Sequence, residues 1–243
     1  MKALAAHHVV PLWERGQGKS LPARALSTLV AACAELDEAE AAALPIGALE
    51  ARLLDLWDLT FGPQIDGYVE CPACGEPLEV PLRTDTLRCG EGPATGAQTL
   101  EQGAWTVRFR SLTWADLVAA AHAENSAAGR AILMERCVIA ASRGEDDRPV
   151  GTLPEAVAGA LAKRLEAADA AAEIRVGLAC PACTHRWSAV FEIADFLWSE
   201  LGAQARRSLL EVHTLASAYG WREKDILALS PARRRFYLDE VWG

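Results

Sequence analysis

Apolar residues recur every three or four positions over much of the chain, which is the spacing of amphipathic helices. The clearest example covers residues 45–60, where leucines and Trp57 share one face and Gly62 marks the end. Residues 1–20 lack this spacing and are expected to be irregular, with Trp13 as their large anchor. Further helices are predicted over residues 21–36, 114–140 (with a break near 125), 152–172, 203–219 and 223–229, and from residue 231 onwards.

Strict alternation of apolar and polar residues is confined to short stretches, which predict strands. Residues 78–82 follow a first pair of cysteines, and residues 174–178 and 187–191 lie on either side of a second pair. Residues 107–110 form another candidate strand. The stretch 84–103 is rich in Gly, Thr, Glu and Gln and is expected to be a loop.

The composition fits one large domain or two small ones, because 51% of the 243 residues are apolar and 23% are charged. Alanine accounts for 47 residues, so leucine and the eight tryptophans must supply most of the bulky core. The formal net charge of −9 argues against a general nucleic-acid coat, which needs a basic surface. No apolar run reaches the roughly 18–20 residues of a membrane span, and the N-terminal residues lack signal-peptide architecture. We therefore expect a cytoplasmic protein.

Seven cysteines, four of them in two identical Cys-Pro-Ala-Cys tetrads, are the most informative feature of the sequence. Two residues between the cysteines let both thiolates reach one ion, and two such pairs supply the four ligands of a closed tetrahedral zinc site. The odd cysteine number and the expected cytoplasmic location argue against a disulfide framework. We predict one structural Zn²⁺ ion held by Cys71, Cys74, Cys180 and Cys183.

Other roles for these cysteines remain open at this point. Either pair alone has the spacing of a redox dithiol, although no thioredoxin-like pattern surrounds it. Cys89 is close enough in sequence to replace a ligand, and His185 follows Cys183 by two residues, where a strand side chain is the simpler interpretation. The turns also differ, because Gly75 follows the first pair and Thr184 the second, at a position that favours a left-handed backbone. We expect the second turn to be either the more strained or already degenerate.

A shared metal site would join two places that are separated by 105 residues, and it therefore defines the expected domain organisation. The predicted fold class is mainly α with a small β zinc ribbon (α+β), in which a helical insertion leaves and returns between the two cysteine knuckles. The parts form one compact unit: an N-terminal helical segment 1–66, a discontinuous ribbon 67–83 and 174–192, a mostly helical insertion 84–173 and a C-terminal helical segment 193–243.

Sequence patterns typical of enzymes are missing. The tripeptide GKS at residues 18–20 resembles the end of a phosphate-binding loop, but Trp13 stands where that motif needs glycine. No GxSxG or HExxH motif is present. The five histidines have no evident nucleophile or carboxylate partners in the sequence, and Cys33 and Cys137 lie among apolar residues, as small core side chains do. We predict a protein without enzymatic activity.

The C-terminal segment admits two interpretations. Its helix–turn–helix pattern around Gly220 and the arginines at 233–235 are typical of a nucleic-acid-binding regulator. Over residues 201–243, however, seven basic residues are balanced by five acidic ones, as on an ordinary solvated face. The aromatic residues point instead to protein contacts, either with a partner or with the preceding helix. The candidate partner-binding residues are Trp221, Phe236, Tyr237 and Trp242.

Several segments, in their order along the chain, resemble one family of phage proteins. The sequence has LLDLWDLTFGP before the first tetrad, CPACGEPLEV at it, VRFRSLTWADL and ILMERCV in the insertion, CPAC and then WSAVF at the second tetrad, and EVHTLASAYGWREKDILALSPARRRFYL in the tail. Together these segments resemble the T-even phage type of baseplate hub assembly protein, or assembly chaperone. Bacterial members of that family are encoded with phage-tail-like contractile injection systems.

The resemblance implies a non-enzymatic assembly or scaffold protein for the baseplate hub of such a system, with no catalytic residues to carry over. Its implied partners are baseplate and hub subunits, and its implied location is the cytoplasm or an assembled tail-like particle. The alternative from the residues themselves is a zinc-ribbon or helix-turn-helix regulator that binds nucleic acid. The sequence leaves the oligomeric state open.

Overall fold

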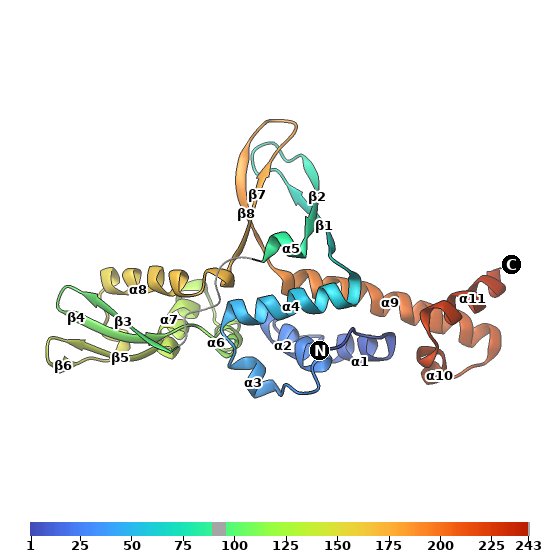
Figure 1. Ribbon diagram of the computed structural model, residues 1–243, viewed down its shortest axis with the longest axis horizontal. Coiled ribbons are helices and arrows are strands. Elements are labelled where there is room, and N and C mark those ends of the chain that lie inside the picture. Colours follow the sequence, from blue (N-terminus) through green and yellow to red (C-terminus); the bar gives the residue numbers. More distant parts are fainter. Residues whose placement is uncertain (89–95, 243) are drawn as a thin grey trace.

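The structure is a computed structural model that describes residues 1–88 and 96–242, the side chain of Trp242 excepted. It is 56% helical with small antiparallel sheets, so the fold class is α+β. Figure 1 shows an elongated molecule, in which a central helical body carries two β-hairpins on one side. A mixed insertion lies at one end of the body and a short helical arm at the other.

The central body consists of five helices that enclose the main hydrophobic core. Fully buried leucines dominate this core, as the composition predicts, and Trp57 and Trp114 add bulk to it. No helix within the two described ranges is long and apolar enough to cross a membrane. The helices of the body are α1 (Ala6–Gly16), α2 (Leu21–Ala32), α3 (Glu38–Ala42), α4 (Ile46–Phe61) and the first part of α9 (Ile193–Tyr219).

The prediction of an irregular N-terminal segment is wrong, because helix α1 occupies most of it. Val9, Val10 and Leu12 are buried in the core between α2 and α9, so tertiary packing stabilises this helix. Pro11 lies inside the helix and no side chain caps its first turn. Both features are unfavourable to a helix in isolation, which explains why sequence patterns do not reveal it.

The two hairpins are separate two-stranded antiparallel sheets. The first pairs β1 (Gln64–Glu70) with β2 (Pro77–Arg83), and the second pairs β7 (Ile174–Ala179) with β8 (Arg186–Phe191). The short helix α5 (Thr84–Leu87) follows the first hairpin. Helix α9 begins directly after the second hairpin, at Ile193 rather than at the predicted residue 203.

The insertion combines its helices with a four-stranded antiparallel sheet in the order β3-β4-β5-β6. Its separate core includes Val107, Phe109 and Leu161. The strands are β3 (Ala97–Gln102), β4 (Trp105–Arg110), β5 (Val138–Arg143) and β6 (Asp146–Asp147). The helices are α6 (Trp114–Ala120), α7 (Ser126–Cys137) and α8 (Glu155–Ala168), with the 3-10 turns η1 (Val150–Thr152) and η2 (Ala170–Ala172).

Two predicted elements of the insertion need correction. The expected loop over 84–103 contains α5 and strand β3, and the expected helix over 114–140 ends at Cys137, where β5 begins. Strand β5 follows α7 without any turn residue, and Val138 pairs with Phe109 of β4. The strand is therefore stabilised by a partner that is distant in sequence, which local periodicity does not show.

The arm is formed by the distal part of α9 together with α10 (Glu223–Ala228) and α11 (Pro231–Trp242). Helix α9 has 27 residues and is therefore about 40 Å long. It ends at Gly220, whose φ of +69° is left-handed, as expected for a helix C-terminus. A small third core, built around Leu215 and Ile226, holds α10 and α11 against α9 and α1.

Candidate metal centre

Alternating residues give each hairpin an apolar inner face, and these two faces lie against one another. On the first hairpin the inner face includes Val80 and Leu82, and on the second it includes Val176 and Phe191. The two faces line a shared cavity of only about 110 Å³. The hairpins therefore stack face to face, which brings their cysteine-bearing turns to the same height above the body (Figure 1).

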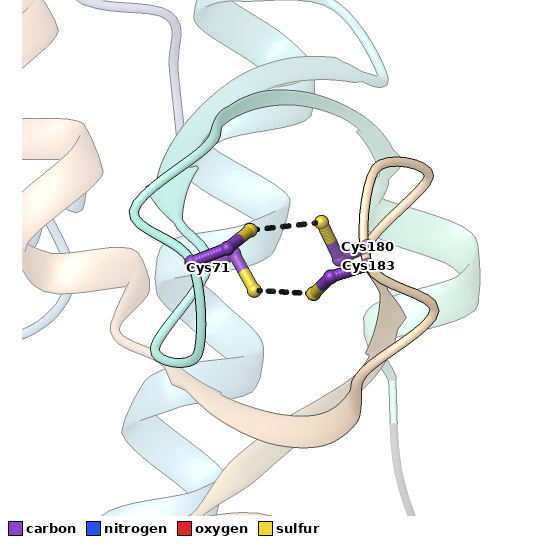
Figure 2. Close-up of side chains that lie close together, drawn as sticks. Cys71, Cys180 and Cys183 are labelled. Carbon is purple, nitrogen blue, oxygen red and sulfur yellow. Dashed lines mark hydrogen bonds between the residues drawn. The ribbon is translucent and has the colours of Figure 1, made fainter.

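The four cysteines of the two tetrads meet at the tips of the hairpins. Their sulfur atoms all lie within 4.8 Å of one another. The Sγ atoms of Cys71 and Cys183 are 3.7 Å apart, and so are those of Cys74 and Cys180. Figure 2 shows the side chains pointing toward one another from the two turns. Because a disulfide would need about 2.05 Å, these are four free thiols whose spacing suits one shared metal ion.

The two turns have the same backbone hydrogen bonds. The N–H groups of Gly75 and Thr184 donate to the carbonyls of Cys71 and Cys180, at 2.8 and 2.9 Å. Both residues have a left-handed backbone, with φ values of +74° and +60°. Thr184 is the one non-glycine residue with a positive φ in the part of the chain that the structure describes. A left-handed backbone costs a β-branched residue more than it costs glycine, which supports the prediction that the second turn is the more strained.

Electrostatics distinguish the thiols within each pair. Burial opposes ionisation of Cys71, but backbone N–H groups of Ala73 and Cys74 and the neighbouring thiols outweigh it and lower its pKa to about 7. For Cys74 the amide of Glu76 favours the thiolate, whereas the thiol of Cys183, burial and the remaining thiols raise its pKa to about 12. Four thiolates this close repel one another, so full ionisation requires a cation among them.

The arrangement has the features of a closed structural site. Cys71 and Cys180 are buried, while Cys74 and Cys183 are exposed at the outer side of the tip. Four protein sulfurs would fill a tetrahedral coordination sphere, which leaves no position for a reacting water or substrate. The arrangement could therefore hold a metal ion and fasten the two hairpins together, but it offers no Lewis-acid chemistry.

Of the other ligand candidates, His185 does not join this cluster. His185 contributes its backbone carbonyl, which accepts a hydrogen bond from Cys180 N–H, while its ring stacks on Trp187 at a centroid distance of 5.8 Å. It is absent from the group of metal-ligating side chains found among the described residues. Cys89 lies outside the described residues. Cys33 and Cys137 are buried apolar residues, in agreement with the sequence interpretation.

The aromatic residues of the C-terminal arm are divided between its core and its surface. Trp221 and Tyr237 pack edge to face, with ring centroids 4.9 Å apart, and both contact the arm core. Phe236 points away from that core and is 58% exposed. The side chain of Trp242 is not described. Only part of the predicted aromatic set is thus available at the surface.

The arginine triplet of α11 is also divided. Arg234 is only 5% exposed, donates to a Glu211 carboxylate oxygen at 2.7 Å and donates to the Leu229 carbonyl. Arg233 and Arg235 are exposed, on different sides of the helix. The triplet therefore does not form one basic face of the kind that a DNA-recognition helix presents.

Comparison with known proteins decides the family. The family model described as "T4 bacteriophage base plate protein" matches residues 14–198, which is most of the chain. The chain belongs to this family. No curated protein and no solved structure matches it.

Membership of the T4 bacteriophage base plate protein family confirms the resemblance at the level of a phage baseplate protein. It indicates a structural role in the baseplate, contacts with other baseplate proteins and incorporation in a phage tail-like particle. The match covers the body from the last turn of α1 onwards, both hairpins and the insertion, and it ends within the first turns of α9. The arm lies beyond the matched residues.

Proposed function

We propose that the chain is a non-enzymatic, zinc-stabilised assembly or scaffold protein for the baseplate hub of a contractile, phage tail-like injection system. Cys71, Cys74, Cys180 and Cys183 would bind a single structural Zn²⁺ ion. The observation that carries the zinc part is the spacing of the four sulfur atoms. Family membership carries the baseplate part.

The sulfur spacing agrees with tetrahedral zinc coordination. A Zn–S bond of about 2.3 Å implies an edge of about 3.8 Å between two sulfurs of a regular tetrahedron. Two of the four cross-hairpin distances are 3.7 Å, and no two of the four sulfurs are more than 4.8 Å apart. Four soft thiolate donors in a tetrahedral set are typical of zinc or an iron–sulfur centre, and a closed structural site favours zinc.

Zinc would convert two weak hairpins into one ribbon-like module. An isolated two-stranded hairpin is marginally stable in water, and here each hairpin contacts the other through one apolar face only. A structural zinc site contributes on the order of 10 kcal/mol or more to the folding of small modules. The ion would also fix the points where the insertion leaves the body and returns to it, since these points are the bases of the two hairpins.

The arm is the proposed docking site for a hub or baseplate subunit. The sequence assigns this role to Trp221, Phe236, Tyr237 and Trp242. The difference in burial supports two separate roles for these residues. Trp221 and Tyr237 hold α11 in place, and the exposed Phe236 contacts the partner. Exposed aromatic side chains are frequent anchors in protein interfaces.

Capture of purified hub subunits on the immobilised protein tests this docking site. Removal of residues 231–243 should abolish capture, and Phe236→Ala alone should weaken it about tenfold or more, as expected for an aromatic anchor. Tyr68→Ala is the matched control, because Tyr68 is 72% exposed and belongs to β1, which lies far from the arm (Figure 1). Undiminished capture by a folded protein without residues 231–243 would exclude the arm as the docking site.

A further inference from the structure

A second surface feature lies on the side of the body that is remote from the arm. It is a cavity of about 560 Å³ at the junction of the body and the insertion. Helices α7 and α8 of the insertion form two of its walls, and the start of α4 forms part of the base. Cavities at such junctions are common binding sites. Its apolar lining includes Ile46, Leu112, Leu133, Met134 and Leu165.

The rim of this cavity carries one exposed, unpaired charged side chain of each sign, while the carboxyl group of Asp169 is buried in the lining and accepts a hydrogen bond from Gly47 N–H at 2.9 Å. Arg130 belongs to α7 and Glu166 to α8, and both are exposed. Neither makes an ion pair with another described residue. The nearby Arg175 is different, because its guanidinium is bonded to both oxygens of Glu173, at 2.9 and 3.1 Å. A fitting occupant therefore has an apolar anchor with a basic group on one side and an acidic group on the other.

The outer face of α11 has this pattern. Phe236 is exposed on it, Arg233 lies one turn before, and Asp239 and Glu240 lie one turn after. All three charged side chains are exposed and none of them pairs with another described residue. The opposite face of the helix packs on α9, so Phe236 is held outward by a fixed helix rather than by a loop.

The arm and the cavity of one chain are too far apart to meet. Figure 1, drawn with the longest axis horizontal, shows α11 at one end of the molecule, and α7 and α8 on the far side of the body in the insertion. We propose that the cavity between α7 and α8 receives α11 of a second copy of this chain. In this contact Phe236 enters the apolar cavity, Arg233 faces Glu166, and Asp239 and Glu240 face Arg130.

This inference rests on the proposed function, because it names the partner of the arm as another copy within the baseplate. The contact joins two different surfaces, so it is heterologous. Repetition of a heterologous contact closes a ring or continues as an open chain. In either case the average size of the oligomers formed by the purified protein would increase with protein concentration.

Sedimentation velocity of the purified full chain over a wide concentration range tests the contact. The unaltered protein should self-associate, and Phe236→Ala and Glu166→Arg should each weaken the association by about tenfold or more. Arg233→Glu should restore association when it is combined with Glu166→Arg, since the pair is then reversed. Arg235→Glu is the matched control, because it makes the same charge change on another side of α11 and should have little effect.

A mixture of Phe236→Ala with Glu166→Arg gives the sharpest test. Each variant retains the surface that the other has lost, so the mixture should form dimers and nothing larger. Growth beyond dimers in this mixture, or a monomeric unaltered protein at every concentration, would overturn the inference. Capture of a hub subunit through Phe236 by a protein that stays monomeric would overturn it as well, while leaving the proposed docking function intact.

Discussion

Gly75 and Thr184 occupy the same position in two copies of one turn, four residues after the first cysteine of each pair. Each donates its N–H to that cysteine's carbonyl, and each has a left-handed backbone. Glycine adopts this conformation without steric cost, whereas a residue with a β-branched side chain does not. Comparison of Thr184 with Gly75 thus shows the same turn once with a strained residue and once with an unstrained one.

Thr184→Gly should stabilise the protein by about 1 kcal/mol, because it removes the left-handed strain at this position. Gly75→Thr is the matched control and should destabilise by a similar amount, since a Cβ at Gly75 would meet open space and only the backbone conformation opposes it. Midpoints of urea unfolding measure both changes. A loss of stability in Thr184→Gly would mean that the hydroxyl of Thr184, 2.6 Å from the Cys183 carbonyl, outweighs the strain.

The clustering of the four cysteines was predictable, because a metal-ligand pattern predicts that residues lie close together in space even when they are far apart along the chain. Two identical CPAC tetrads predict one shared site however many residues separate them. The left-handed turn at Thr184 also followed from its alignment with Gly75. Face-to-face stacking of the hairpins was not predictable, because Val80 and Val176 belong to different sheets. The sequence of one hairpin does not show which of its faces the other hairpin will cover.

The pair of arginines on Asp116 gives a prediction about stability. Asp116 is fully buried and accepts hydrogen bonds from Arg110 at 2.6 Å and from Arg136 at 2.8 Å. Burial alone would raise its pKa, but Arg110, the Thr113 amide and Arg136 lower it to about 2. Asp116→Asn should destabilise the insertion by about 2–3 kcal/mol at pH 7, because it leaves two arginines without a counter-charge.

The pH dependence of that loss has a defined sign. A carboxyl group whose pKa is lower in the folded state stabilises that state when the pH is above the pKa of the unfolded state, near 4. This stabilisation disappears as the pH falls toward 2. The difference between the parent and Asp116→Asn should therefore shrink between pH 5 and pH 2 in denaturant titrations. Asp146→Asn, at an exposed ion pair with Arg148, should change stability by at most about 0.5 kcal/mol. A difference for Asp116 that is independent of pH would contradict this account.

Glu50 should give the stability of the protein the opposite dependence on pH. Its Oε2 atom is buried without a hydrogen-bond partner among the described residues. Burial, and then the charges of Glu192 and Asp169, raise its pKa to about 8. Between pH 4.3 and pH 8 the folded state binds more protons than the unfolded state, so this residue lowers stability as the pH rises.

Glu50→Gln removes that dependence while it keeps the shape of the side chain. The variant should equal the parent near pH 4 and exceed it by roughly 3–4 kcal/mol at pH 7. Glu135→Gln, at an exposed position of α7, serves as the control and should follow the parent at both values. Parallel stability curves for the parent and Glu50→Gln would show that water or a nearby group already compensates the Glu50 charge.

The elements that the sequence did not predict depend on partners that are distant along the chain. Strand β5 exists because Val138 and Ala141 pair with Phe109 and Val107 of β4, about 30 residues earlier. Helix α1 exists because its apolar residues fill a core made largely by α2, α4 and α9. The cavity at the junction draws its lining from several separate segments, so no single motif indicates it. Local periodicity carries no information on such pairings.

Metal analysis of the purified protein, together with Cys180→Ser, tests the central claim most directly. The account predicts one zinc ion per chain, and it predicts that Cys180→Ser loses this ion and loosens the two hairpins. Elemental analysis measures the first, and denaturant unfolding with amide hydrogen exchange of residues 64–83 and 174–191 measures the second. A protein that contains no metal, with a Cys180→Ser variant as stable as its parent, would contradict the zinc-stabilised scaffold.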